Sequence, residues 1–328
     1  MSNKIIVIAS AGGHLTQALC ACSKLSDFTI ITDVNHLAGI SNKVVVFKST
    51  QFNFFIHLMN FFLGFFLFIR YMPKVVISTG GPIFLPFAVL ARLFGCKVIF
   101  IDTLSRVKEL SNTGKMIKKL KLATYFICQW KAMAEKFDCI YIGKCFDILS
   151  ENAYPKEEDV DVGRPLIFVT VGTNVYHFAR LFEYIAAMPL YKDPRVDWVI
   201  QCGPHLIQAT EATHKVVSSL SRREVEDYVQ KSALVISHCG IGSINLMLSY
   251  RKTVIFIPRL AAFDEFSDDH QLQIASELVN DKFYIVSNET DMPNISYEQL
   301  TGTKIIKTPI DIVNYKFAEE IKKLVGPL

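Results

Sequence analysis

Short runs of consecutive apolar residues alternate with helix-length segments along the whole chain, and this arrangement occurs twice. Runs that are apolar at every position predict strands covered on both faces, as in parallel sheets. In the first half we expect strands at Ile5–Ala9, Phe28–Thr32, Val44–Phe47, Val75–Ser78, Val98–Ile101, Tyr125–Cys128 and Cys139–Ile142. In the second half we expect them at Leu166–Thr170, Trp198–Gln201, Val216–Val217, Leu234–Ser237, Val254–Ile257 and Phe283–Val286. The pattern predicts an α/β protein with two doubly wound, Rossmann-like domains.

A change in composition marks the boundary between the two predicted domains. Residues 150–165, SENAYPKEEDVDVGRP, are polar and acidic and end just before a new strand, as a linker does. Asp159 and Asp161 form a DxD, a spacing that some transferases use to hold a metal on a nucleotide diphosphate, but their charged surroundings favour a linker. We expect a first domain at 1–150, a linker at 151–165, a second domain at 166–310, and a C-terminal helix at 311–328 that packs across the domain junction.

The segment Phe52–Ile69, FNFFIHLMNFFLGFFLFI, is the most apolar part of the chain, and its 18 residues barely reach the length that crosses a bilayer. Its polar and small residues share one helical stripe, so aromatic side chains cover most of the circumference. A core helix, a helix lying in the membrane interface and a membrane span are all open, and the interfacial helix is favoured. The stripe consists of Asn53, His57, Asn60 and Gly64.

Composition excludes some classes of protein. With 51% hydrophobic and 20% charged residues among 328, the chain is too apolar to be disordered and too mixed for a polytopic membrane protein. A net charge of +4 does not indicate nucleic-acid binding. Residues 1–155 carry 17 basic and 8 acidic side chains, whereas residues 156–328 carry 18 and 23. The first half is therefore expected to face an anionic partner, such as a phosphate-bearing ligand or an acidic lipid surface.

The cysteines and the N-terminus indicate the compartment. The eight cysteines are scattered and form no CxxC pair, which favours reduced, buried thiols. The first residues, MSNKIIVIASAGGH, contain too short an apolar run for a signal peptide. We expect a cytoplasmic protein.

Two glycine-rich turns follow predicted strands in the first half. Ser10-Ala11-Gly12-Gly13-His14 opens the first helix, and Ser78-Thr79-Gly80-Gly81-Pro82 ends a later strand. Glycines at such turns let backbone amides approach a phosphate, and open α/β sheets bind ligands at these strand ends. His14 could act there as a general base, or it could only bind or cap.

The second half repeats this arrangement. Val171-Gly172-Thr173-Asn174 follows its first strand, and His238-Cys239-Gly240-Ile241-Gly242-Ser243 follows a later strand and begins a helix. Backbone amides, a helix N-terminus and a hydroxyl together suit a phosphate. Pro258-Arg259-Leu260 closes the next strand, and polar groups suited to sugar hydroxyls follow it, although they could also be the N-terminal charges of a helix. These groups are Asp264, Glu265, Asp268, Asp269, His270 and Gln271.

Several of these segments resemble a known family. VTVGTNVYHFARL, SHCGIGSI and PRLAAFDEFSDDHQLQIA resemble the catalytic subunit of the two-part UDP-GlcNAc transferases of dolichol-linked oligosaccharide synthesis, and still more the bacterial capsule and exopolysaccharide glycosyltransferases. IASAGGH, VVISTGGP, IDTLSRVKELSNTGK and FICQW resemble the membrane-anchoring partner subunit. In this chain the two would be fused with the partner half first, and the resemblance covers nearly all of the sequence.

The resemblance implies a GT-B fold, in which two Rossmann-like domains face a central cleft. It implies a UDP-sugar donor in the second domain and a polyprenyl-diphosphate-linked saccharide acceptor in the first. Implied donor-binding residues are Gly172, Thr173, Asn174, His238, Gly240, Gly242, Ser243, Arg259, Glu265, Asp269, His270 and Gln271. Implied acceptor-binding residues are Gly12, Gly13, Gly80 and Gly81, with His14 or Asp102 as catalytic base. One departure concerns the ribose: Leu246 stands where many relatives have Glu, so this contact falls to Asp264 or Glu265.

The implied reaction is inverting transfer of a hexose-type sugar: a base deprotonates an acceptor hydroxyl, which attacks the anomeric carbon as UDP leaves. Amides at Gly240–Ser243 would stabilise the departing diphosphate, so neither a metal nor another cofactor is expected. The resemblance also implies capsule or exopolysaccharide synthesis at the inner face of the plasma membrane. Peripheral attachment would use Phe52–Ile69 and a basic cluster of Lys115, Lys118, Lys119 and Lys121.

Three other functions fit parts of the pattern. A UDP-sugar epimerase can share the fold, since fold alone does not determine function. A non-catalytic membrane scaffold of a polysaccharide assembly complex would also use the apolar helix. A nicotinamide dehydrogenase is disfavoured, because the chain lacks a full GxGxxG with a matching acidic residue.

Overall fold

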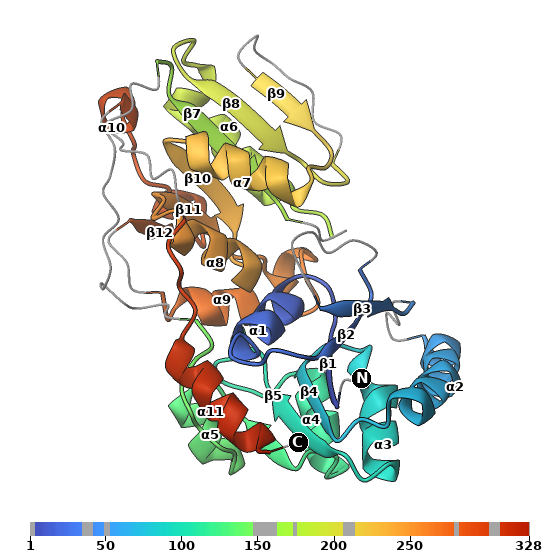
Figure 1. Cartoon of the computed structure of the whole chain (residues 1–328). Coiled ribbons are helices and arrows are strands. Elements are labelled where there is room, and N and C mark those ends of the chain that lie inside the picture. The colour runs from blue at the N-terminus through green and yellow to red at the C-terminus, as the bar shows by residue number, and fades with distance from the viewer. Residues whose placement is uncertain are drawn as a thin grey trace. The chain divides into compact units, whose positions relative to one another are not determined.

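The computed structural model describes residues 4–34, 42–48, 53–146, 163–172, 176–205, 214–278, 282–301 and 309–327. The chain divides into two compact units, Met1–Asp147 with Val313–Leu328, and Ile148–Ile312 (Figure 1). The predicted linker at 151–165, with Asp159 and Asp161, lies mostly outside the described residues. Each unit contains one sheet of six parallel strands.

The first sheet has the strand order β3-β2-β1-β4-β5-β6. The order reverses between β1 and β4, which makes this strand pair the topological switch point of the sheet. Its strands are β1 (Ile5–Ala9), β2 (Thr29–Thr32), β3 (Lys43–Val46), β4 (Val75–Gly80), β5 (Lys97–Ile101) and β6 (Tyr125–Ile127). Its helices are α1 (Gly13–Ala21), α2 (Phe54–Tyr71), α3 (Phe84–Leu93), α4 (Asn112–Lys119), α5 (Lys131–Phe137) and α11 (Tyr315–Val325).

The second sheet has the equivalent order, β12-β11-β10-β7-β8-β9, with its switch point between β7 and β10. Its strands are β7 (Leu166–Thr170), β8 (Asp197–Gln201), β9 (His214–Val217), β10 (Leu234–His238), β11 (Val254–Ile257) and β12 (Phe283–Ile285). Its α-helices are α6 (Ala179–Ala187), α7 (Arg222–Lys231), α8 (Ile241–Ser249), α9 (His270–Ala275) and α10 (Tyr297–Thr301). Short 3₁₀ turns are η1 (Pro189–Lys192), η2 (Ala261–Phe263) and η3 (Glu289–Asp291).

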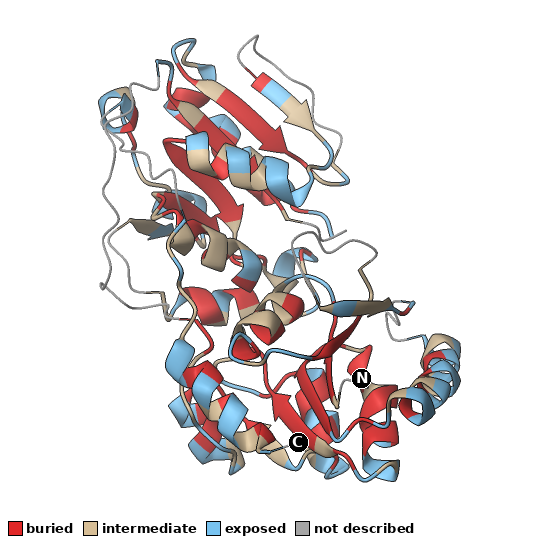
Figure 2. Ribbon diagram, in the orientation of Figure 1, coloured by how far each residue is buried: buried red, intermediate tan, exposed pale blue. Residues whose placement is uncertain are grey.

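The central strands are buried along their length, as Figure 2 shows by the red strands in both units. In β1 every residue is buried, which explains why this strand is apolar without alternation. Strand β4 is buried throughout as well, including the polar residues Ser78 and Thr79. The prediction of a strand at Cys139–Ile142 is wrong. Asp138 adopts a left-handed conformation that ends α5, and beyond it the chain makes a single parallel bridge, between Ile140 and Ile127.

Helix α11 completes the first unit although it lies at the far end of the sequence. Its apolar side packs beside α1, and Phe317 and Ile321 are fully buried. Lys97 Nζ donates hydrogen bonds to the carbonyl oxygens of Leu324 (3.0 Å) and Val325 (2.9 Å) at its C-terminal end. A cation there also complements the helix dipole.

Helix α2 packs on α3 through its polar and small stripe, which is the reverse of an ordinary amphipathic helix. Asn60 is buried and donates to the carbonyl of Lys48, and a Cβ at Gly64 would lie 2.7 Å from a Phe87 ring carbon. The aromatic face points outward, with Phe55 78% and Phe66 68% exposed. By length and composition α2 is also the one helix in the described part of the chain that could cross a bilayer, a weak criterion that core helices can meet.

Candidate active site

The two glycine-rich turns of the first unit meet at its switch point, because β1 and β4 are neighbours in the sheet. Gly81 has φ +90°, and a Cβ there would lie 2.1 Å from the hydroxyl oxygen of Ser10. Gly12 has φ +75° and faces open space, since nothing described lies within 4 Å of a Cβ built on it. The two turns therefore approach each other closely, and the space beside Gly12 is open to a ligand.

His14, in the first turn of α1, bridges these two turns. Its Nδ1 donates to the carbonyl oxygen of Thr79 (2.7 Å), and the Thr79 hydroxyl donates to the carbonyl oxygen of His14 (2.6 Å). A carbonyl only accepts, so Nδ1 carries the hydrogen and the basic lone pair of the neutral ring lies on Nε2. This arrangement fits a general base whose orientation is set by the neighbouring strand.

Asp102, the other residue expected as a base, occupies a structural position. It is buried, and its carboxylate accepts from the Ser111 hydroxyl (2.5 Å), the Ser111 amide (3.0 Å) and the Thr103 amide (3.0 Å). Burial raises the pKa of Asp102, although the hydrogen bonds from Ser111 oppose this shift. The carboxylate fixes the loop that begins α4, and a role of Asp102 as the base stays a prediction.

Two buried glutamines, which the sequence analysis did not single out, support the first site. Gln17 donates to the carbonyl of Gly13 (3.1 Å), and its side-chain oxygen accepts from the Leu104 amide (2.8 Å) and from Gln129 (2.8 Å). This network ties the start of α1 to the ends of β5 and β6. The one signal in the sequence is the spacing of Gln17 four residues after Gly13, which is one helical turn.

At the switch point of the second unit, the ring of His238 lies between two glycines. Gly172 has φ +73°, and a Cβ there would lie 2.4 Å from Cε1 of His238, while a Cβ on Gly240 would lie 2.6 Å from its Nε2. Burial, with a smaller contribution from the nearby Arg259 charge, lowers the pKa of His238 to about 3. The ring is therefore neutral at physiological pH, and it fills the space between the two turns.

Gly240 is the N-cap of α8, and this end of the helix is open. A Cβ on Gly242 would meet nothing described within 4 Å, and Ser243 is half-buried on the same turn. The Gly172 amide donates to the Thr170 hydroxyl (3.1 Å), and the Gln201 side chain donates to the Gly172 carbonyl (3.0 Å), so the facing turn is also held from behind. A phosphate group fits such a pair of turns. Thr173 and Asn174 lie outside the described residues.

Arg259 and Glu265, expected to contact the donor, are instead buried behind these turns. Arg259 is 0% exposed and donates to backbone carbonyls, and Glu265 is 2% exposed and forms a two-pronged ion pair with Arg180 (2.7 and 3.0 Å). Burial lowers the pKa of Arg259 to about 10. Both side chains are directed inward, toward backbone carbonyls and Arg180, and the donor contacts expected of them stay predictions.

In the segment that leads into α9, some polar side chains are buried and others are exposed. Gln271 is buried, and its side-chain oxygen accepts from the amides of Cys239 (3.1 Å) and Arg259 (3.2 Å). Asp269 is exposed and accepts from the Ala261 amide (2.7 Å), and His270 is half-buried with its Nδ1 2.6 Å from a carboxylate oxygen of Asp268. Asp264 is exposed, whereas Leu246 is half-buried on α8. Asp264 and Asp269 are therefore the exposed carboxylates of this segment.

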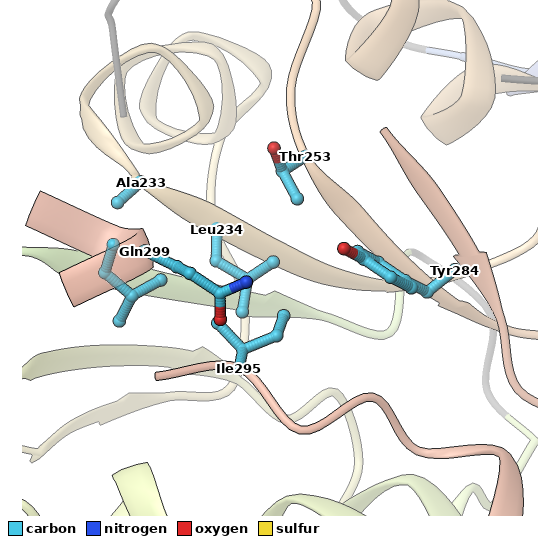
Figure 3. Close-up of a pocket in the computed structure, with 7 residues that line it drawn as sticks. Ala233, Leu234, Thr253, Tyr284, Ile295 and Gln299 are labelled. Atoms are coloured by element: carbon cyan, nitrogen blue, oxygen red, sulfur yellow. The ribbon is translucent and has the colours of Figure 1, made fainter. Parts of the chain in front are cut away.

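A pocket of about 170 Å³ in the second unit lies at the opposite end of the sheet (Figure 3). Leu234 begins β10 and Thr253 precedes β11, so the pocket is at the amino ends of these strands. Its volume is below the roughly 300–1,000 Å³ of ordinary ligand sites. Among the residues with described positions, no three His, Cys, Asp or Glu side chains group as metal ligands would.

Two family models match the chain, one in each unit. Residues 21–145 match the model described as oligosaccharide biosynthesis protein Alg14 like, and residues 166–301 match the glycosyltransferase family 28 C-terminal domain. The chain is a fused two-part glycosyltransferase.

Individual relatives show the same two parts. The human UDP-N-acetylglucosamine transferase subunit ALG14 is 26% identical over 44% of this glycosyltransferase and 83% of its own length. A relative from Borreliella burgdorferi, named UDP-N-acetylglucosamine--N-acetylmuramyl-(pentapeptide) pyrophosphoryl-undecaprenol N-acetylglucosamine transferase, is 22% identical over 98% of this chain and 93% of its own length. The second relative spans both units.

Solved structures show the same fold. MurG from Acinetobacter baumannii superposes with a TM-score of 0.57, at 14% identity, over 97% of this chain and 99% of its own. A UDP-N-acetylglucosamine 2-epimerase from Rickettsia bellii superposes with a TM-score of 0.60, at 11% identity, over 99% and 96%. Structural likeness therefore does not separate a transferase from an epimerase, and the family match does. The predictions of a GT-B fold class and of a glycosyltransferase are confirmed. The domain bounds, the central cleft and the individual site residues stay predictions.

Proposed function

We propose that this enzyme transfers a sugar, with inversion at the anomeric carbon, from a UDP-sugar to a saccharide carried on a polyprenyl diphosphate. The observation that carries the proposal is the pair of switch-point sites, each with glycine-rich turns and a histidine, in segments that match the Alg14-like and family 28 models. Catalysis requires the two sites to share one cleft during the reaction.

The donor is expected at Gly172, Gly240, Gly242 and Ser243, where the N-terminus of α8 is open. Amides there would stabilise the charge that develops on the departing diphosphate, a contribution often worth several kcal/mol. The names of both relatives include UDP-N-acetylglucosamine, so we propose this donor first, and other UDP-hexoses second. Asp264 and Asp269 are proposed to bind hydroxyls of the donor.

The acceptor is expected at Gly12, Gly13 and the Gly80–Gly81 turn, with His14 as general base. The printed acceptor of the Borreliella burgdorferi relative is a pyrophosphoryl-undecaprenol, which supports a polyprenyl diphosphate here. That acceptor carries N-acetylmuramyl-pentapeptide. We nevertheless propose a capsule or exopolysaccharide product, because the second-half motifs resemble those glycosyltransferases most.

Attachment to the cytoplasmic face of the plasma membrane is proposed to use the outward aromatic face of α2. A helix that buries its polar stripe in protein and exposes Phe55, Phe62 and Phe66 suits the boundary of a bilayer. Of the predicted basic cluster, Lys118 donates to the carbonyl of Asp138 and Lys115 pairs with Glu109. Lys119 and Lys121 are exposed and are the proposed partners of anionic lipid.

The direct test is transfer of radiolabel from a panel of UDP-hexoses into the lipid fraction of membranes that contain the protein. With His14→Asn, whose side-chain amide nitrogen takes the position of Nδ1 and can still donate to the Thr79 carbonyl, we expect kcat to fall by about 10²- to 10⁴-fold while UDP affinity is unchanged. Asp102→Asn is the matched comparison: it should lower the melting temperature rather than the rate of the folded fraction. A normal rate with His14→Asn would show that His14 is not the base.

Two results would favour the alternatives. Interconversion of UDP-sugars without any lipid acceptor would indicate an epimerase. Undiminished polymer synthesis in cells that carry both His14→Ala and His238→Ala would indicate a scaffold without catalysis.

A further inference from the structure

Arg259 follows β11, and its buried guanidinium contacts the chain that follows a different strand, β7. Nη1 donates to the carbonyl oxygens of Tyr176 (3.0 Å) and His177 (3.1 Å), and Nη2 donates to that of Val171 (3.2 Å). These carbonyls lie on both sides of residues 173–175. One side chain therefore contacts the described chain at Val171, next to Gly172, and again at Tyr176 and His177.

Among the described residues no carboxylate forms an ion pair with Arg259, although the nearby Glu265 charge partly offsets the effect of burial on its pKa. The Glu265 carboxylate pairs with Arg180, and the Glu265 backbone carbonyl, rather than its carboxylate, accepts from Arg259 (3.1 Å). Burial lowers the pKa of Arg259 to about 10, so the guanidinium remains charged at neutral pH. Its Nε has no hydrogen-bond partner among the residues that the structure describes, and its planar group lies 4.4 Å over the Phe178 ring. A buried charge without a paired carboxylate is costly for the fold alone.

Arg259 is also joined to the turn after β10. The side-chain oxygen of Gln271 accepts from the Arg259 amide and from the Cys239 amide, so the ends of β10 and β11 are linked. Between the linked turns the ring of His238 fills the gap from Gly172 to Gly240, where a single added carbon would lie 2.4 and 2.6 Å from it. A small shift of either turn would change the distance between the backbone amides at Gly172 and those at Gly240.

We propose that Arg259 is a positioning residue of the donor site, whose guanidinium fork fixes the Gly172 turn against the Gly240 turn. The inference rests on the proposed function, because the spacing matters only if both turns receive a diphosphate. Planar, fixed donors can satisfy several carbonyls at once, whereas an ammonium is a point charge on a flexible stem. Arg259→Lys keeps the positive charge but removes the planar guanidinium, so this variant tests the hydrogen-bond geometry separately from the charge.

The test compares wild-type protein with Arg259→Lys by calorimetric titration with UDP and by donor kinetics. We expect UDP affinity to fall by about 10- to 100-fold and the donor KM to rise in step, while kcat falls less. Hydrogen exchange should quicken at the described amides of 171–172 and 176–178 and stay unchanged in β8. Arg222→Lys on α7, an arginine 82% exposed, is the matched control and should change none of these.

The outcomes separate the inference from the proposed function. If wild-type protein shows no UDP affinity, the proposed function fails first. If wild-type protein binds UDP and Arg259→Lys binds within twofold of it, the positioning role is overturned and the proposed function stands. If Arg259→Lys does not fold, Arg259→Met, which removes the buried charge, is judged by the same criterion. Failure of both variants to fold would show a role in folding alone and would also overturn the inference.

Discussion

Gly81 illustrates how a single residue can be determined by a neighbouring turn. Its φ of +90° disfavours any side chain, and a Cβ would also overlap the Ser10 hydroxyl at 2.1 Å. We expect Gly81→Ala to lower the free energy of unfolding by about 2–4 kcal/mol, from backbone strain and overpacking together. Gly95→Ala is the control, since Gly95 has φ +68° but no described atom within 4 Å of a Cβ, and it should cost only about 1 kcal/mol. If Gly81→Ala and Gly95→Ala lowered the free energy of unfolding equally in urea denaturation, the result would contradict an overlap between a side chain at position 81 and Ser10.

Lys252 provides a test of pH dependence. It is 2% exposed, and Nζ donates to the carbonyls of Gln230 (2.8 Å) and Ser232 (2.7 Å) at the end of α7. Burial lowers its pKa from 10.5 to about 8, with a smaller effect of Lys282. At a pH between about 8 and 10.5, Lys252 is protonated in the unfolded chain and largely neutral in the folded chain. The contribution of Lys252 to stability therefore rises with pH, by up to about 3 kcal/mol.

The measurement is the free energy of unfolding from pH 7.5 to 10.5 for wild type and Lys252→Met. The difference between the two should change across this range, because only the wild type has the depressed titration. Lys231→Met, at an exposed lysine that ends α7, should leave the slope as it is. Parallel curves for wild type and Lys252→Met would show that the folded lysine titrates normally.

At the scale of one element, α2 packs against α3 through the side that carries its polar and small residues. Gly64→Val would force a side chain against Phe87 and Leu90, at 2.7 and 2.9 Å from the Cβ position, and we expect a loss of about 1–3 kcal/mol on thermal unfolding. Phe66→Ser removes a side chain that is 68% exposed and should change stability by less than about 0.5 kcal/mol. The same Phe66→Ser should weaken sedimentation with anionic vesicles. Stable Gly64→Val protein would mean that α2 does not pack closely on α3.

The sequence predicted the strands well and the roles of polar side chains less well. Runs such as Ile5–Ala9 and Val254–Ile257 are apolar at every position, so their existence and direction followed from pattern alone. The polar stripe of α2 was also visible, but whether it faces protein or solvent depends on the small contact surface that α3 offers to Gly64. Arg259 and Glu265 belong to a polar segment that also contains exposed acidic residues, and only the tertiary packing shows that Arg259 and Glu265 are buried.

At the scale of the whole molecule, the first unit is discontinuous in sequence, since α11 returns to it after the second unit. Its buried side, with Phe317, Ile321 and Val325, covers the first unit, and Lys97 caps its end. Deletion of residues 313–328 is therefore expected to destabilise the first unit by several kcal/mol, given about 1.5–3 kcal/mol for each fully buried apolar side chain.

The second unit makes no use of α11 in its sheet or in the Gly172–His238–Gly240 contacts, so the proposed donor site should survive the deletion. Calorimetry of the shortened chain should show one transition lowered and another unchanged, and UDP affinity should stay within about threefold of wild type, because the two cores are separate. Loss of UDP affinity together with the first unit would mean that the donor site depends on both units for its shape. Retained affinity with lost sugar transfer would place acceptor binding alone in the unit that α11 completes.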